Sequence, residues 1–320
     1  MQSFIIEMCG HTTLIANPKH NVAQTGCEST MSNDLAGHKV GDYLVERQLG
    51  AGAMGEVYQA QRGNHHFAMK IMHGELAEQD SLRERFLREV RLMQALQHPH
   101  IVPIVDFGWH GKRLFLVMPY IDGTALANID YAAGLTPRQV WKVVEPLSKA
   151  LEHAHLQGVI HRDLKPSNVL LSNADDHVYL LDFGLGKRPD LDTRLTETGV
   201  SVGTPAYMSP EAAVGEEVDF RTDIYSMGIM LYELLLGKLP FDESDDMALV
   251  YAHLYKSVPL PSDENPEFPD ALEAVILRCL LKDKRDRYGS VRQFMNDFAE
   301  ALNGMSDAEL NRTYAPASEV

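Results

Sequence analysis

The chain has 320 residues, 45% of them hydrophobic, and a formal net charge of −16, which together indicate one or two globular domains and argue against nucleic acid or an anionic membrane as the general partner. Its three cysteines are too few for a disulfide framework and are typical of a reducing compartment. No apolar run approaches the roughly 18 residues of a membrane helix, and no secretory signal is recognisable, so we expect a soluble, cytoplasmic protein.

Residues 1 to about 40 are polar and lack sustained periodicity, which predicts a flexible N-terminal extension. Met31 lies shortly before the first strand pattern, so residues 1–30 are alternatively a mis-assigned leader that precedes the true start. A metal site in this segment is a third alternative, which its spacing does not favour because it matches no zinc pattern. The residues that would form it are Cys9, His11, His20 and Cys27.

From residue 43 to about residue 118 the pattern predicts strands around one helix. Short, apolar, β-prone segments predict strands at 43–45, 56–60, 67–71 and 114–118. Apolar residues recur at helical spacing over 82–96 and predict the helix.

A glycine-rich segment of the form G-x-G-x-x-G-x-V lies between the first two predicted strands. Glycine lets backbone N–H groups approach phosphates because no Cβ intervenes. Dinucleotide-binding folds use a similar motif between a strand and a helix, whereas here a strand follows and Lys70 lies beyond it. We therefore favour a loop that covers the phosphates of a nucleoside triphosphate. Its residues are Leu49, Gly50, Ala51, Gly52, Ala53, Met54, Gly55, Glu56 and Val57.

Helices dominate after residue 136. Thr136 and Pro137 form a typical N-cap and first helical position, and an apolar face follows up to Leu151. Pro146 lies within this helix and is expected to kink it. Further helices are predicted at 224–236, which is apolar on nearly all sides, at 271–281 and at 291–302. Residues 304–320 are interpreted as a tail.

The most informative segment is 159–171, VIHRDLKPSNVLL, which holds a carboxylate, an ammonium and a carboxamide between apolar residues. Phosphoryl transfer to a hydroxyl needs these groups: Asp163 as the base, Lys165 as a cation for the phosphate, and Asn168 as an oxygen ligand for Mg²⁺. The segment resembles the catalytic loop of the eukaryotic-type (Hanks-type) serine/threonine protein kinases, especially their bacterial branch.

The resemblance implies an α+β, bilobal protein kinase fold with a β-rich N-lobe, one main N-lobe helix and a mostly helical C-lobe. It implies ATP and Mg²⁺ as cofactors. Lys70 would bind the α- and β-phosphates while paired with Glu89, and Asp182, in an Asp-Phe-Gly motif after a predicted strand, would hold Mg²⁺ together with Asn168. The adenine ring and hinge would contact Val57, Ala68, Met118, Tyr120, Ile121 and Leu170. Pro119 departs from the acidic residue that is common in the hinge.

The resemblance extends to the end of an activation segment at 203–211. Thr204 would help to select Ser/Thr acceptors, and Ser209 replaces the commoner alanine. Glu211 would pair with Arg287 to brace the large lobe, and Asp223 would anchor the backbone of the catalytic loop.

Arg162 directly precedes the expected base. In the family such an arginine often waits for a phosphate, so we expect activation by autophosphorylation in trans at Thr196 and Thr198, with transient self-association. The alternative is that both are ordinary loop threonines.

Several histidines have structural interpretations. Glu152, His153 and His155 are interpreted as surface residues of the helix before the catalytic loop rather than as a metal cluster. His161 is expected to pack against Phe183.

We therefore expect an extension at 1–40, a kinase domain at 41–303, with its N-lobe at about 41–118 and its C-lobe at about 122–303, and a tail at 304–320. Protein substrates with Ser/Thr acceptors are the expected partners. The alternatives are a pseudokinase-like scaffold that binds nucleotide without efficient transfer, and a small-molecule phosphotransferase. A longer natural form with a membrane helix and a sensor domain stays open.

Overall fold

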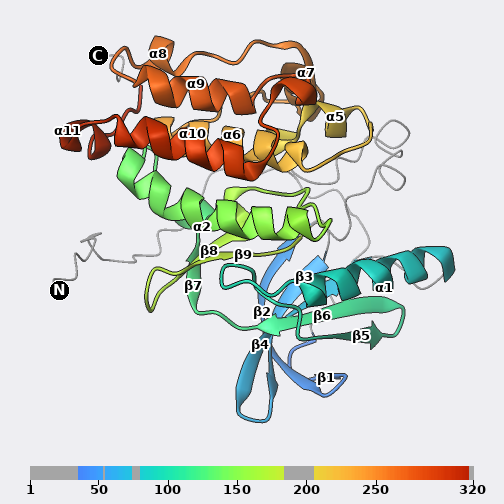
Figure 1. The fold of residues 1–320 in the computed structure, drawn as a ribbon. Coiled ribbons are helices and arrows are strands. Elements are labelled where there is room, and N and C mark those ends of the chain that lie inside the picture. The colour runs from blue at the N-terminus through green and yellow to red at the C-terminus, as the bar shows by residue number, and fades with distance from the viewer. Residues whose placement is uncertain (1–34, 53–54, 74–79, 184–204, 317–320) are drawn as a thin grey trace, which may run out of the picture. The chain divides into compact units, whose positions relative to one another are not determined.

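The computed structural model describes residues 35–52, 55–73, 80–183 and 205–316. Over these residues a strand-rich N-lobe is followed by a mostly helical C-lobe (Figure 1). This order confirms the predicted α+β class and the bilobal kinase fold.

The N-lobe is built on a six-stranded antiparallel sheet with the strand order β1-β2-β3-β4-β6-β5. Its elements are β1 (Lys39–Val40), β2 (Tyr43–Gly52), β3 (Gly55–Arg62), β4 (His65–Met72), α1 (Asp80–Ala95), β5 (Asp106–His110) and β6 (Arg113–Pro119). The predicted strands correspond to β2, β3, β4 and β6, and the predicted helix corresponds to α1.

Strand β5 was not predicted, because its sequence, DFGWH, is short and includes Asp and Gly, which are poor strand formers. Its pairing with β6 makes it a strand: Gly108 lies opposite Phe115 in the register. A Cβ added at Gly108 would lie 2.6 Å from the Phe115 ring, so the glycine allows the two strands to pack closely.

The C-lobe surrounds α6, whose side chains are almost all buried. Its helices are α2 (Pro137–Leu156), α5 (Pro210–Ala213), α6 (Arg221–Leu236), α7 (Asp246–Tyr255), α8 (Pro261–Glu264), α9 (Asp270–Cys279), α10 (Val291–Asn303) and α11 (Asp307–Leu310). A three-stranded sheet contains β7 (Gly123–Ala125), β8 (Val169–Ser172) and β9 (Val178–Leu180). Short 3₁₀ segments lie at η2 (Leu126–Asn128), η3 (Pro166–Asn168), η4 (Pro205–Tyr207) and η5 (Lys284–Asp286).

Local sequence signals account for the helix ends. Thr136 and Gln139 form a reciprocal capping box at the start of α2, and the helix continues through Pro146. Helix α6 ends at Gly237, which has a φ of 73°. A Cβ there would lie 2.2 Å from the carbonyl oxygen of Ala132, so only glycine fits this left-handed position.

Residues at both edges of the predicted domain pack more closely than expected. Val40, assigned to the flexible extension, is fully buried and pairs with Tyr43 through β1 and β2. Within the predicted tail, α11 forms and Tyr314 is fully buried with its ring 5.4 Å from that of Phe268. The domain limits stay predictions, and the structure places β1 within 35–40 and α11 within 304–316.

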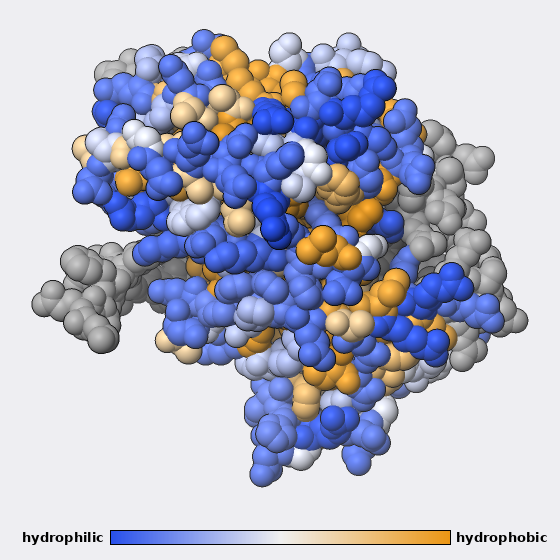
Figure 2. Space-filling model, in the orientation of Figure 1, coloured by the Kyte–Doolittle hydropathy of each residue, from blue (hydrophilic) through white to orange (hydrophobic). Residues whose placement is uncertain are grey.

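The face shown in Figure 2 is covered mainly by hydrophilic residues, with smaller groups of hydrophobic ones between them. In the part of the chain that the structure describes, no helix combines the length and the apolar character needed to cross a bilayer.

Candidate active site

The register of the N-lobe sheet brings several of the expected nucleotide-contacting residues together. Gly50 pairs with Val57, and Val57 pairs with Lys70 on the next strand. Ala68, two positions before Lys70, pairs with Met118. Because alternate residues of a strand lie on the same face, Ala68 and Lys70 share one face of β4.

The first residue of β3, Gly55, has no room for a side chain. A Cβ added there would lie 2.3 Å from the carbonyl oxygen of Ile71 on β4. Any side chain would therefore force β3 and β4 apart where they pair at Gly55 and Met72.

Lys70 joins the two lobes. Its ammonium lies 2.8 Å from a carboxylate oxygen of Asp182, and the two side chains are 13% and 30% exposed. Sequence reasoning predicted a pair with Glu89 instead. Glu89 lies half-buried on α1, and the Lys70–Glu89 pair stays a prediction.

Asp163, Lys165 and Asn168 lie together, as their spacing predicts. The Lys165 ammonium is 3.1 Å from Asp163 Oδ2. The Asn168 side-chain amide donates to the backbone oxygen of Asp163 at 2.7 Å and to Oδ2 at 3.1 Å. The single 3₁₀ turn η3 provides this closeness, because it turns the chain back between the lysine and the asparagine.

The hairpin of β8 and β9 places Asn168 near Asp182. Val169 pairs with Leu180, and the Leu181 N–H donates to the Asn168 carbonyl at 2.8 Å. Asp182 has a φ of 50°, a left-handed conformation that costs about 1–3 kcal/mol in a residue other than glycine. Such strain is typical of functional sites. The left-handed conformation turns the chain away from the direction of β9 at Asp182.

Asn168 and Asp182 have the oxygen ligands that Mg²⁺ prefers, and Mg²⁺ commonly takes one or two protein ligands with the rest from phosphates and water. Among the described residues, no group of three or more His, Cys, Asp or Glu residues could hold a metal by itself. The pair therefore fits a metal that arrives with a phosphate ligand.

Asp223 anchors the catalytic loop, as predicted. Its carboxylate is fully buried and accepts the backbone N–H groups of His161, at 2.9 Å, and Arg162, at 2.8 Å. The second bond holds Arg162 at its left-handed φ of 62°. Burial raises the pKa of Asp223, but the hydrogen bond and charge of His155, together with His161, lower it below its usual value, so the carboxylate is ionised at neutral pH.

The interpretation of His155 as a surface residue is wrong. Its Nε2 lies 2.7 Å from Asp223 Oδ2, and its side chain is only 10% exposed. A signal was present in the sequence, because His155 follows Leu151 by one helical repeat and continues the apolar face of α2.

His161 packs as predicted. It is fully buried with its ring 4.8 Å from that of Phe183, and its Nε2 donates to the carbonyl of Leu181 at 2.8 Å. Burial lowers the pKa of His161, against the raising effect of Asp223, so the ring is neutral and acts as a spacer between the catalytic loop and Phe183.

We expect Asp223→Ala to lower the rate of the phosphoryl transfer predicted from the sequence at least tenfold, and the free energy of unfolding by about 3 kcal/mol or more. The substitution leaves buried donors on His155, His161 and Arg162 without their acceptor, at about 1–3 kcal/mol for each unsatisfied group. Denaturant unfolding and initial rates measure the two effects. The exposed Asp242→Ala should change neither, and equal behaviour of the two variants would contradict the anchoring role.

Glu233 is a second carboxylate of α6 that sequence reasoning missed. It accepts from the hydroxyl of Tyr131 at 3.1 Å and from that of Tyr207 at 2.5 Å. Burial raises its pKa, although these two hydrogen bonds act in the opposite direction. A single glutamate within an otherwise apolar run is the signal that could have identified it, because a buried carboxylate needs partners.

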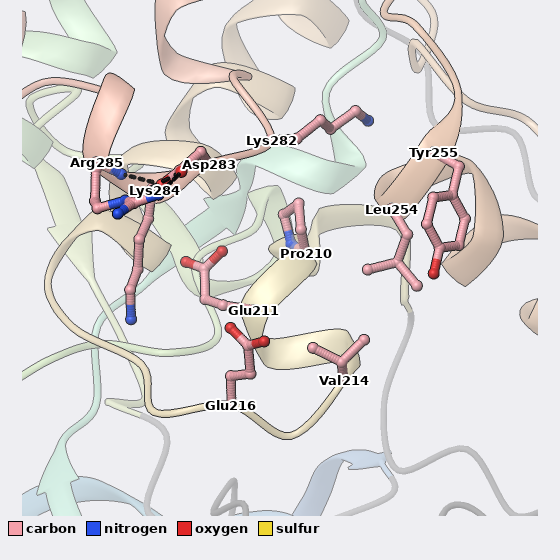
Figure 3. Close-up of a pocket in the computed structure, with 10 residues that line it drawn as sticks. All are labelled: Pro210, Glu211, Val214, Glu216, Leu254, Tyr255, Lys282, Asp283, Lys284 and Arg285. Atoms are coloured by element: carbon pink, nitrogen blue, oxygen red, sulfur yellow. Dashed lines mark hydrogen bonds and ion pairs between the residues drawn. The ribbon is translucent and has the colours of Figure 1, made fainter.

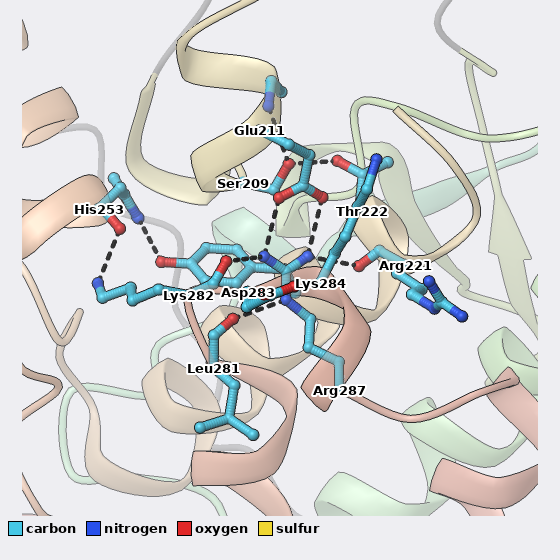
Figure 4. A network of polar contacts seen from close by, with 12 residues as sticks. Ser209, Glu211, Arg221, Thr222, His253, Leu281, Lys282, Asp283, Lys284 and Arg287 are labelled. Carbon is cyan, nitrogen blue, oxygen red and sulfur yellow. Dashed lines mark hydrogen bonds and ion pairs between the residues drawn. The ribbon is translucent and has the colours of Figure 1, made fainter. Parts of the chain in front are cut away.

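The predicted Glu211–Arg287 pair is present and almost fully buried (Figure 4). Two parallel bonds of 2.8 Å join the guanidinium to the carboxylate. The remaining Arg287 donors bind the carbonyls of Leu281, at 2.7 Å, and of Arg221 and Lys282, both at 3.1 Å. One arginine thus ties two segments of the C-lobe, residues 281–282 and the start of α6, to the end of the activation segment.

Ser209, which stands where alanine is commoner, has a structural use. Its hydroxyl lies 2.6 Å from that of Thr222 and accepts the Ala212 N–H as the N-cap of α5. The serine therefore adds a bond between α5 and α6 beside the Glu211–Arg287 pair (Figure 4).

A pocket of about 470 Å³ lies beside this network (Figure 3). Val214, Leu254 and Tyr255 contribute its apolar part, and charged residues from 282–285 line the other part. None of its lining residues belongs to 159–171 or 178–182, so it is separate from the catalytic loop.

Some predicted residues lie outside the described residues, and their roles stay predictions. They are Cys9, His11, His20, Cys27, Met31, Ala53, Met54, Thr196, Thr198 and Thr204.

Comparison with known proteins gives consistent results. A family model described as "Protein kinase domain" matches residues 43–299. A serine/threonine-protein kinase PknH of Mycobacterium bovis is 38% identical over 86% of this chain and 46% of its own length. A DNA damage-responsive serine/threonine-protein kinase, RqkA of Deinococcus radiodurans, is 41% identical over 78% of this chain and 38% of its own. The chain thus spans less than half the length of these curated relatives.

Solved structures show the same similarity. The kinase domain of Mycobacterium tuberculosis PknI, as a double mutant, matches with a TM-score of 0.68 and 31% identity over 83% of this chain and 98% of that one.

Proposed function

The chain belongs to the protein kinase domain family, and on this basis we propose that it transfers the γ-phosphoryl group of Mg·ATP to serine and threonine hydroxyls of proteins. The observation that carries the proposal is the convergence of Lys70, Asp163 and Asp182 from two lobes. Lys70 contacts Asp182, and the β8–β9 hairpin brings Asp182 next to the Asp163–Asn168 loop. A scaffold has no need for this set of groups.

In the proposed reaction the Asp163 carboxylate orients the acceptor hydroxyl and takes its proton as the new P–O bond forms. The bond from the γ-phosphorus to the leaving oxygen breaks, and ADP departs with that electron pair. Lys165, whose ammonium lies 3.1 Å from Asp163 Oδ2, would neutralise the negative charge of the transferred group. Mg²⁺, when bound by Asn168 and Asp182, would offset the charge of the β- and γ-phosphates.

The nucleotide would lie under the glycine-rich hairpin. Gly50 and Val57 are paired across β2 and β3, and Lys70 is adjacent, so phosphate-binding and ring-covering groups share one part of the sheet. Ala68 and Met118 pair across β4 and β6, two residues along β4 from Lys70, where the adenine would lie. Since this reaction consumes cellular ATP, we place the domain in the cytoplasm.

Regulation by phosphorylation is part of the proposal. The buried Nε of Arg162 has no hydrogen-bond partner among the described residues, although the backbone of Arg162 is held by Asp223. A phosphate of about −1.5 to −2 charges on Thr196 or Thr198 would supply such a partner. Transfer between two copies of the chain would deliver that phosphate.

The test is incubation of the purified chain with Mg²⁺ and γ-labelled ATP, followed by phosphoamino acid analysis and mass spectrometry. We expect phosphoserine or phosphothreonine, no labelling when EDTA removes the metal, and modification of Thr196 or Thr198. ATP binding without any transfer would instead favour a pseudokinase-like scaffold. Labelling at other sites alone would retain the kinase but contradict the proposed regulation.

A further inference from the structure

Four imidazoles form a row where the segment after α1 meets the C-lobe. His98 and His100 lie on that segment, His153 lies on α2, and His177 lies between β8 and β9. The ring centres of His153 and His98 are 5.3 Å apart, those of His98 and His100 are 5.6 Å apart, and those of His100 and His177 are 4.4 Å apart. We call these four residues the histidine row. All four are half-buried.

Hydrogen bonds specify which nitrogens of the row carry protons. The backbone N–H of His100 donates to His98 Nδ1 at 3.2 Å, so that nitrogen is unprotonated. His100 Nδ1 donates to the carbonyl of Val178 at 2.9 Å, and His177 Nε2 donates to that of Pro99 at 3.0 Å. His98 is thus the member of the row whose contact requires a neutral ring.

The same segment is attached to β9 through its backbone. The Leu180 N–H donates to the His100 carbonyl at 2.8 Å, and the Val102 N–H donates to the Leu180 carbonyl at 3.1 Å. Strand β9 continues directly into Asp182, and the segment continues back into α1. A change at His98 would therefore alter the backbone pairing between the segment that follows α1 and β9, the strand that leads to Asp182.

We infer that His98 is a pH-sensitive contact: its neutral ring fixes the turn from His98 to His100, whose backbone pairs with β9, and its protonation weakens that attachment. A proton on Nδ1 would turn the acceptor into a donor facing the His100 N–H. It would also add a positive charge next to other basic groups. The inference does not depend on the proposed kinase activity, because its consequence is a change in stability and local opening.

The surroundings of His98 favour its neutral form. Burial is the largest cause that lowers its pKa, followed by His153, His100 and Lys149. Burial also lowers the pKa of His100, with His177 and Lys149 acting in the same direction and the Val178 carbonyl and Glu145 opposing them.

Further charged and titratable groups lie on α2 and β9 around the histidine row. Glu145 and Lys149 form an ion pair of 2.8 Å on α2, and Tyr179 packs its ring 4.6 Å from His177. Glu145 is paired with Lys149, and Lys149 lowers the pKa of His98.

The direction of the pH effect follows from linkage. The pKa of His98 in the folded chain lies below the ordinary value of about 6.5. As the pH falls, His98 is therefore protonated at a higher pH in the unfolded chain than in the folded one. The contribution of His98 to stability is therefore complete above about pH 6.5. It is lost as the pH falls from there through the folded-state pKa.

The test compares the full chain with His98→Asn between pH 7.5 and 5.5. The oxygen of the asparagine side chain can accept the N–H two residues on, as in an Asx turn, but does not titrate. We expect the melting temperature of the wild type to fall by about 2–4 °C more than that of the variant over this range. The matched control, His65→Asn at an exposed position of β4, should lose as much as the wild type.

Amide hydrogen exchange provides a second measurement that needs no variant. After correction for intrinsic rates, the exchange of the Val102 and Leu180 amides of the wild type should accelerate as His98 titrates in NMR spectra. A neutral His98 that carries its proton on Nε2 at pH 7.5 is also expected. Titration of His98 without faster exchange, or equal pH sensitivity of wild type and His98→Asn, would overturn the inference.

Discussion

Replacement of Asp163 by asparagine is expected to reduce the rate of phosphoryl transfer by about 10²–10⁴-fold, which is the usual contribution of a positioned general base. Asparagine has nearly the same shape and keeps an oxygen for the Asn168 amide, 3.1 Å away. It cannot take the acceptor proton, and it provides no negative charge for the Lys165 ammonium. The fold and the affinity for ATP should change little, so the loss should appear in kcat.

The measurement is the initial rate of label incorporation, with nucleotide affinity determined separately. The matched control is Asp242→Asn, the same substitution at an exposed position. This variant should transfer phosphoryl groups at the wild-type rate. If Asp163→Asn also transferred at that rate, the assignment of the base would be wrong even if the chain is a kinase.

The largest effect on stability is expected for Arg287→Ala, which should lower the free energy of unfolding by about 3–5 kcal/mol. The side chains of Arg287 and Glu211 are 0% and 4% exposed, so removal of the arginine leaves a buried carboxylate without its counter-charge. It also leaves the carbonyls of Leu281, Arg221 and Lys282 without their donors. Unfolding in urea measures the change.

Arg285→Ala is the matched control two residues away. Arg285 also pairs with a carboxylate, that of Asp283, but its side chain is 79% exposed. Surface pairs contribute about 0–1 kcal/mol, so this variant should be nearly as stable as the wild type. Removal of both buried charges, by Glu211→Leu with Arg287→Met, should restore part of the loss. Equal stability of the two alanine variants would show that the buried pair has no special importance.

The buried pair also has a predictable dependence on pH. Burial raises the pKa of Glu211, but the hydrogen bonds and charge of Arg287 outweigh it, and the pKa lies below its usual value. The stability that the pair provides is therefore complete above about pH 4.3, the unfolded-state value, and is lost as the pH falls below it. The loss of this contribution begins at a lower pH than the loss of the His98 contribution, which begins below about pH 6.5.

The sequence by itself was sufficient to predict the candidate site and much of the fold. The spacing of Asp163, Lys165 and Asn168 is short enough for one 3₁₀ turn to bring them together, so a local pattern was sufficient. The same holds for the strands around the glycine-rich segment and for the capping box at Thr136, because each depends on residues close together in the chain.

Only the tertiary structure decided what depends on partners distant in the chain. His155 looked like a surface residue until α6 placed Asp223 beside it, and β5 became a strand only through its pairing with β6. Tyr314 belongs to the core because Phe268 lies against it. A local pattern indicates which residues favour burial and which need a charged partner. Long-range packing determines which groups come into contact, and therefore which of these requirements are satisfied.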